Sequence, residues 1–165
     1  MNQDKTAAQE KHGGQLRLEA HVDKTLRENN IEQKELINGM MKSEKVGCSY
    51  DEGTITFAFP VQPWQANRVG KLHGGMISVA FDMTIAALAR FYARENFAPT
   101  ISLDVKYVRP VEVGDTLLVT ARAVAAGKRI TQLTCEAVSK NTGKIAATGA
   151  SVYMNADTVR ERSRP

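Results

Sequence analysis

The sequence has little cysteine, no recognisable leader and no regular metal-binding pattern. Its two cysteines, Cys48 and Cys135, lie far apart and share no zinc or redox spacing with a second cysteine or a histidine, so we expect no metal site. Isolated thiols are typical of a reducing compartment. The first residues carry acids and no apolar stretch, so no export signal is expected. These features predict a cytoplasmic protein without a metal or a resident cofactor.

Long apolar runs and strongly basic runs are also missing. The longest apolar stretch is interrupted by Asp82 and Thr84 and ends at Arg90, so we expect no membrane span and no membrane partner. The net charge is only +4, and no basic run is interleaved with aromatic residues, which argues against a nucleic-acid partner. The small excess of positive charge fits either a solvated surface or attraction to an anionic ligand such as a phosphorylated cofactor.

The sequence does contain a long, nearly all-apolar helical pattern, which follows His73-Gly74-Gly75. A helix that is apolar almost all round is a buried helix. Asp82 lies in the middle of this pattern, and a carboxylate is rarely buried without a partner, because removing its charge from water is costly. From the residues alone, Asp82 is either an ion-pair partner of a Lys or Arg, a cap for a local bend, or a catalytic group.

The remaining chain predicts an α+β domain with extensions at both ends. Residues 1–13 are polar and expected to be disordered, and residues 15–41 show a helical apolar stripe with a step at residues 28–30. Period-two segments then predict two strands, the buried helix, and four further antiparallel strands. We therefore expect a helical arm over 1–45, a globular domain over 46–155 and a polar tail over 156–165.

One antiparallel sheet of five or six strands covers only one side of an apolar helix. The uncovered side must meet another chain, so we expect a homodimer with the two helices packed near the two-fold axis. Gly74 and Asp82 are eight residues apart, or ~12 Å along one helix, and cannot reach the same small group. Antiparallel helices from two subunits would bring Gly74 of one chain near Asp82 of the other.

The residues before and at the start of the buried helix suggest an anion-stabilising turn. The first N–H groups of a helix lack partners and carry partial positive charge, and Gly74 and Gly75 allow a ligand to approach the backbone closely. Such a helix start can stabilise an oxyanion that forms on a carbonyl. The glycines can equally serve to relieve crowding in a tight turn. For His73, orientation of the turn and of a substrate carbonyl is the preferred role, and general-base duty is the second.

The stretch NRVGKLHGGMISVAFDMTIAALA resembles the signature of the hotdog-fold thioesterases of the phenylacetate-degradation (PaaI-like) family. In that family Asn-x-x-Gly-x-x-His-Gly-Gly is followed by an Asp nine residues after the His. APTISLDVKYVRPVEVGDTL is similar to the strand and loop after the family's central helix, and the resemblance covers roughly residues 46–154. It implies a hotdog fold, in which an antiparallel sheet wraps a long helix, and an acyl-CoA thioesterase that commonly forms a dimer of dimers, a homotetramer.

The resemblance also implies roles for single residues. Gly74 matches the position whose amide binds the thioester oxygen, and Asp82 matches the carboxylate that attacks the thioester or activates water. Asn67 and His73 match polar residues that hold the thioester or the water. Thr100 matches a Ser/Thr position that helps to place that water, and many relatives have Ser there.

Coenzyme A, which is part of the substrate, carries phosphates, so cationic side chains are expected at the mouth of the site. The candidates for substrate binding are Gly75, Arg68, Arg109, Lys128 and Arg129, and the cations among them can equally be exposed strand-end or turn charges. Two other functions remain open. One is a non-catalytic acyl-CoA sensor of the same fold, and the other is a structural or hydratase-like hotdog protein.

Overall fold

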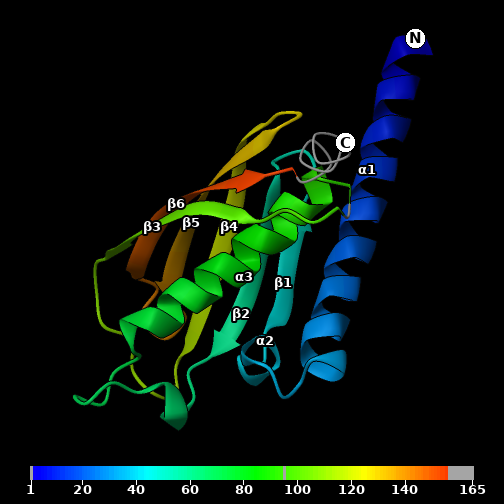
Figure 1. Ribbon diagram of the computed structural model, residues 1–165. Coiled ribbons are helices and arrows are strands. Elements are labelled where there is room, and N and C mark those ends of the chain that lie inside the picture. The colour runs from blue at the N-terminus through cyan, green and yellow to red at the C-terminus, as the bar shows by residue number, and fades with distance from the viewer. Residues whose placement is uncertain (1, 95, 156–165) are drawn as a thin grey trace, which may run out of the picture.

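The computed structural model describes residues 2–94 and 96–155 and contains one six-stranded antiparallel sheet with helices on one side (Figure 1). The chain begins with α1 (Asn2–Arg27), a π-helical turn (Glu28–Glu32) and the short α2 (Ile37–Met40). Strands β1 (Glu44–Ser49) and β2 (Thr54–Pro60) and a 3₁₀ turn (Pro63–Gln65) lead to α3 (Gly74–Tyr92). The remaining strands are β3 (Thr100–Tyr107), β4 (Thr116–Ala126), β5 (Ile130–Ser139) and β6 (Ile145–Met154). This confirms the predicted α+β class and the predicted order of elements.

The sheet has the strand order β1-β2-β4-β5-β6-β3 and curves around α3 (Figure 1). Alternation along the strands decides which side chains reach the helix, because neighbouring side chains point to opposite faces. In β2, Ile55, Phe57 and Phe59 are buried, and β2 pairs with β4 through Phe57↔Val119. Gly53, with φ +61°, forms the tight turn between β1 and β2, where a left-handed backbone favours glycine.

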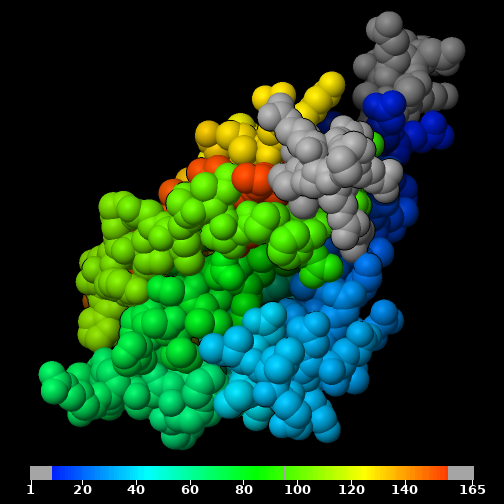
Figure 2. Space-filling view, in the orientation of Figure 1, coloured from blue at the N-terminus to red at the C-terminus, as the bar shows by residue number. Residues whose placement is uncertain are grey.

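Helix α3 is buried on the side that faces the sheet and partly exposed on the other. Phe81, Ile85 and Leu88 are fully buried, whereas Val79, Asp82 and Ala86 are only partly buried. The uncovered side is visible in Figure 2 as the green surface between β3 and the N-terminal arm. We expected no stretch with the length and apolar composition of a membrane span, and this expectation was wrong. The 19 residues of α3 have both. Half of that stretch is buried inside the fold, as in the core helix of a soluble domain.

Helix α1 lies along strand β1, at one edge of the sheet, and also contacts α3 (Figure 1). Leu18 and Val22 enter the core, and His21 Nε2 lies 2.7 Å from the Ala87 carbonyl oxygen. The α-helical geometry ends at Arg27, but residues 28–32 continue as a π-helix, so the break expected at residues 28–30 lies instead at residues 33–36, before α2. The expected disorder of residues 1–13 was wrong, since α1 begins at Asn2. A polar sequence does not exclude a helix whose later turns are anchored by burial.

The Gln15 side chain joins α1 to the free edge of β1. Its Oε1 accepts a hydrogen bond from the Tyr50 N–H at 2.8 Å, and its Nε2 donates to the Cys48 carbonyl oxygen at 3.1 Å. Lys45 adds an ion pair with Asp23 at 2.8 Å. The Gln15 amide thus pairs with edge groups that a neighbouring strand would otherwise satisfy.

Strand β3 forms the opposite edge and has no covering helix. Ile101 and Tyr107 are 51% and 56% exposed, and Val108 follows at 49%. The predicted globular domain started at residue 46, whereas β1 begins at Glu44. The predicted tail, residues 156–165, lies outside the described residues.

Candidate functional site

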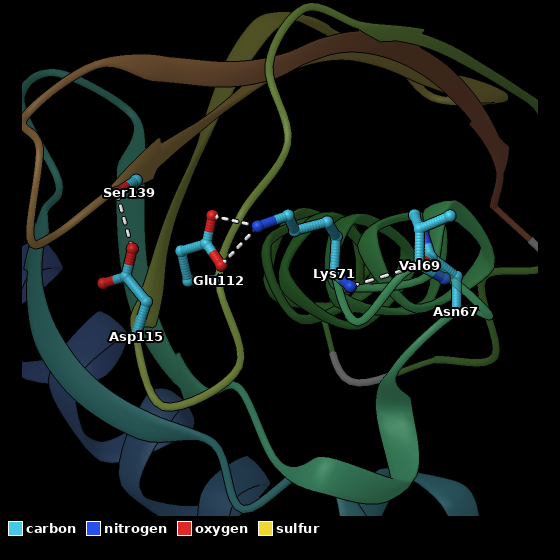
Figure 3. Close-up of polar contacts among 6 residues, drawn as sticks. All are labelled: Asn67, Val69, Lys71, Glu112, Asp115 and Ser139. Atoms are coloured by element: carbon cyan, nitrogen blue, oxygen red, sulfur yellow. Dashed lines mark hydrogen bonds and ion pairs between the residues drawn. The ribbon is translucent and has the colours of Figure 1, made fainter.

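The turn before α3 is shaped by Asn67. The Asn67 Oδ1 accepts hydrogen bonds from the N–H groups of Val69 and Lys71, at 3.0 and 3.1 Å, as Figure 3 illustrates for this turn. Lys71 also pairs with Glu112 at 2.6 Å, which ties the turn to the loop before β4 (Figure 3). The side-chain oxygen of Asn67 is therefore occupied. Its Nδ2 donor has no acceptor among the residues that the structure describes.

His73 caps the start of α3. Its Nδ1 accepts a hydrogen bond from the Gly75 N–H at 2.9 Å, so in a neutral ring the proton lies on Nε2, which can donate outward. A Cβ on Gly75 would lie 3.1 Å from that Nδ1, so the glycine makes room for the cap. This geometry supports an orienting role for His73. The Gly75 N–H is already bonded to His73.

Gly74 presents the N–H group that is still free. Within the described chain this N–H has no acceptor, as expected for the first residue of a helix. A Cβ on Gly74 would lie 3.2 Å from the ring of Tyr107, whose hydroxyl is 2.8 Å from the Ser78 hydroxyl. Gly74, Asn67, Tyr107 and Arg109 line one hollow of about 380 Å³. The helix start is therefore accessible to a ligand and is accompanied by a polar amide and a cation.

Asp82 lies about two turns further along α3 and is held by two hydroxyl groups. The Tyr153 hydroxyl donates to Asp82 Oδ1 at 2.6 Å, and the Thr100 hydroxyl donates to the same oxygen at 3.0 Å. In the part of the chain that the structure describes, Asp82 forms no ion pair with a Lys or Arg, and Oδ2 has no recorded hydrogen bond. An ion pair of Asp82 with a Lys or Arg was one of the roles that the sequence left open, and the described residues do not form it.

Tyr153 is the one contact of Asp82 that sequence reasoning missed. Burial raises the pKa of the Tyr153 phenol, and the hydrogen bond to the Asp82 carboxylate raises it further, so the phenol remains a donor. The strand register explains the cluster, because Tyr153 of β6 pairs with Thr100 of β3. The sequence does contain a sign of this contact, because Tyr153 lies in a strand of mostly small and apolar residues and a buried tyrosine hydroxyl needs a polar partner.

The predicted site residues fall into separate groups. Asn67, His73, Gly74 and Gly75 lie at the start of α3, where Arg109 donates to the Ile145 carbonyl oxygen at 2.9 Å. Arg68 is exposed in the turn before it.

The second group, Asp82 and Thr100, lies at the other end of β3. Lys128 and Arg129 are exposed in the β4–β5 hairpin, which is held by Asn155 near that same end of the sheet. Within one protomer these two residues are therefore not brought to the Gly74 hollow.

No group of three His, Cys, Asp or Glu side chains in the described ranges, 2–94 and 96–155, has the arrangement of a metal site. Chemically, the site offers one free backbone N–H, one amide donor and one hydrogen-bonded carboxylate. Such a set can polarise a carbonyl oxygen and supply a base or a nucleophile, provided that the groups can meet at the same carbonyl.

Comparison with known proteins finds similar proteins among thioesterases. Residues 69–146 match the family described as the Thioesterase superfamily. Over 91 residues the chain is 31% identical to the mouse protein named acyl-coenzyme A thioesterase 13. The aligned part covers 54% of this chain and 64% of that protein. The chain therefore spans less than two thirds of that curated relative.

Solved structures show the same fold. Zebra fish thioesterase superfamily member 2 superposes with a TM-score of 0.71 at 21% identity, covering 81% of this chain and 94% of that one. The PaaI protein from the phenylacetic acid degradation operon of E. coli gives 0.64 at 20% identity, covering 79% and 92%. The predicted hotdog fold and the predicted resemblance to PaaI-like thioesterases are confirmed.

Proposed function

We propose that this chain hydrolyses an acyl-CoA or aryl-CoA thioester to the free acid and coenzyme A, since it has the hotdog fold and residues 69–146 match the Thioesterase superfamily. The observation that carries the proposal is the pair of groups on α3. Within the described residues, the Gly74 N–H is free and opens onto a hollow, and the Asp82 carboxylate is held by hydroxyl groups and has no cation partner. The two free thiols, Cys48 and Cys135, support a reducing, cytoplasmic location.

The active unit in this proposal is a homodimer. Gly74 and Asp82 lie ~12 Å apart along one rigid helix, so they do not act on the same carbonyl from one protomer. Two features support association of two copies: the uncovered side of α3 and the exposed apolar edge strand β3. Pairing of two chains with antiparallel α3 helices gives two equivalent sites, each with Asp82 from one protomer and Gly74 from its partner. A dimer of dimers is the assembly that we expect in solution.

In the proposed reaction the thioester oxygen accepts a hydrogen bond from the Gly74 N–H at the positive end of α3. The Nδ2 of Asn67 and the Nε2–H of His73 are further donors at the same end. Asp82 either removes a proton from water, whose oxygen attacks the carbonyl carbon, or attacks that carbon itself to form a mixed anhydride that water then hydrolyses. In both routes the C–S bond breaks and the thiolate of coenzyme A takes up a proton.

The cations around the helix start fit the phosphates of coenzyme A. Arg109 lines the hollow together with Gly74, and Arg68 lies in the turn before it. Lys128 and Arg129 lie at the other end of the protomer and contribute to a site only if assembly brings the hairpin to it. We therefore assign the phosphate-binding role to Arg109 and Arg68 before the hairpin pair.

The test is a thiol-release assay across aryl, short and long acyl-CoAs, carried out on wild type and on Asp82→Asn. Loss of the carboxylate is expected to lower kcat by about a hundredfold to ten-thousandfold, the usual contribution of a general base, while the assembly stays intact. Asp51→Asn is the matched control, because Asp51 is an exposed carboxylate in the β1–β2 turn.

Three results would contradict the proposal. Tight acyl-CoA binding without thiol release by the wild type would favour the sensor function, and loss of absorbance from an enoyl-CoA would favour a hydratase. Equal turnover by Asp82→Asn and wild type would exclude the mechanism given above.

A further inference from the structure

We propose that Tyr153 is a positioning residue of the thioesterase site, which fixes Asp82 Oδ1 so that Oδ2 is the reacting oxygen. This inference rests on the proposed function and names which atom of Asp82 acts. It follows from the position of the donors around Asp82, because both hydroxyl groups bind the same carboxylate oxygen.

The two donors come from neighbouring strands, Thr100 from the edge strand β3 and Tyr153 from β6, and hold the carboxylate in one orientation. Tyr153 donates to Oδ1 at 2.6 Å and Thr100 donates to it at 3.0 Å. The distance from Tyr153 is that of a charge-assisted O–H···O⁻ bond, which is stronger than one between neutral groups. Rotation of the Asp82 side chain would break both bonds at once. The orientation of the carboxylate is therefore fixed.

A second buried carboxylate in the same chain shows what a purely structural aspartate looks like. Asp115 is 4% exposed, and both of its oxygens are used: Oδ2 accepts from the Ser139 hydroxyl at 2.6 Å (Figure 3), and Oδ1 accepts from the N–H groups of Thr116 and Asn141. A buried carboxylate with donors at both oxygens is fully satisfied. Among the described residues, Asp82 has donors at one oxygen only, and it lies on the partly exposed side of α3. The unshared oxygen is thus the one available for chemistry.

Tyr153 is well suited to the holding role. Its side chain is 1% exposed and its strand is paired on both sides, through Tyr153↔Thr100 and Tyr153↔Thr131. Because burial and the neighbouring carboxylate raise the pKa of the phenol, it does not lose its proton in the range where thioesterases are assayed. A protonated, immobile phenol donates a hydrogen bond and does not itself exchange protons with substrate.

The assignment makes the chemistry specific. In the base route, Oδ2 accepts a proton from water while the water oxygen attacks the carbonyl carbon. In the nucleophilic route, Oδ2 forms the bond to the carbonyl carbon as the C–S bond breaks. Oδ1 keeps its two hydrogen bonds throughout and helps to carry the negative charge of the resting carboxylate.

The test is Tyr153→Phe, which removes the hydroxyl and keeps the ring. We expect kcat to fall about tenfold to a hundredfold, as for loss of one hydrogen bond to a charged group, with KM for an acyl-CoA changed by less than about threefold. Tyr92→Phe is the matched control, because Tyr92 is a partly buried tyrosine at the far end of α3. A Tyr153→Phe enzyme with wild-type kcat, or with a raised KM and unchanged kcat, would overturn the inference.

A double-mutant cycle tests the shared oxygen directly. The cycle combines Tyr153→Phe with Thr100→Val. In each single variant the remaining hydroxyl still holds Oδ1, so the fold-loss of kcat in the double variant should exceed the product of the two single fold-losses. Independent effects would contradict a shared role. If Tyr153→Phe does not fold, ring-fluorinated tyrosine at position 153 replaces it. A kcat that follows phenol acidity supports the inference, and one that ignores it overturns it.

The result is separable from the test of the proposed function. If Asp82→Asn keeps full activity, the thioesterase mechanism itself is wrong. If Asp82→Asn is inactive and Tyr153→Phe is as active as wild type, only the role of Tyr153 is wrong.

Discussion

The two edge strands of the sheet, β1 and β3, differ in what covers them. Strand β1 lies under α1, and the Gln15 amide bonds to its free backbone groups. Among the described residues no helix covers the free edge of strand β3, and its apolar side chains Ile101 and Tyr107 are about half exposed. Exposed edge strands are ready to pair with another chain unless something blocks them. The difference favours β3 over β1 as the edge at which a second copy would pair in the proposed dimer.

Both groups of the candidate site lie against β3, since Tyr107 at the end of that strand lines the Gly74 hollow. Asp82 is held by Thr100 of β3 and Tyr153 of β6, so the carboxylate belongs to the open edge. A second copy that pairs along β3 therefore approaches the side on which the reactive group lies. Assembly and catalysis are expected to fail together when the open edge is altered.

The largest expected effect comes from Ile101→Lys on the open edge. In a two-fold dimer each substitution acts twice, so loss of buried apolar contact is expected to weaken the dimer by about 3–6 kcal/mol, twice the value of one buried Ile side chain. Light scattering after gel filtration, together with thiol release, measures both consequences. Val46→Lys is the control, since Val46 is 55% exposed on the covered edge and Ile101 is 51% exposed. If both variants behave alike, the two edges do not differ in association.

A smaller effect is expected from Gln15→Leu, which keeps the bulk of the side chain and removes its hydrogen bonds to β1. The unpaired Tyr50 N–H and Cys48 carbonyl are expected to lower the free energy of unfolding by about 1–3 kcal/mol and to speed hydrogen exchange at Tyr50. Denaturant unfolding and amide exchange provide the measurements. Gln33→Leu is the control, because Gln33 is exposed beyond the end of α1. Unchanged exchange at Tyr50 would show that α1 does not protect this edge.

The last expected effect appears only at alkaline pH and compares the middle of the sheet with its covered edge. Burial raises the pKa of the Cys135 thiol to about 12, whereas Lys45 partly offsets the effect of burial on the pKa of Cys48. The folded protein keeps the Cys135 proton that the unfolded chain loses near pH 9. The contribution of this thiol to the free energy of unfolding is therefore fully present below pH 9. It decreases by about 1.4 kcal/mol per pH unit as the pH rises towards 12.

Unfolding measured between pH 9 and 11 checks the slope, which should be shallower in Cys135→Ala than in wild type. A thiol reagent at pH 8 should modify Cys48 faster than Cys135. An equal slope in both proteins would mean that Cys135 is not protected by the sheet.

The sequence allowed prediction of the features that depend on local pattern. Period-two segments predicted the strands, and the nearly all-apolar run predicted α3. Asp82 stood out because a charge inside that run needs a reason. The cap by His73 also follows from its place directly before the first residue of the helix.

The features that were missed depend on residues far apart in the chain. Tyr153 and Asp82 are separated by 71 positions, and only the pairing of β6 with β3 brings them together. The order of strands in the sheet likewise depends on packing around α3. The start of helix α1 was predicted too late in the chain, because its polar early turns show little apolar periodicity. The need for glycine at position 14 is explained by the ring of Tyr50, with which a side chain at this position would collide.

The cover that α1 provides over β1 also limits how large an assembly can grow through strand pairing. A sheet with two open edges can add copies without end and form a fibre, because each new copy presents another free edge. With one edge closed, two copies that join through β3 leave only protected edges outside. Growth by this route therefore stops at a pair, and any larger assembly must form through faces of the protein rather than through its strands.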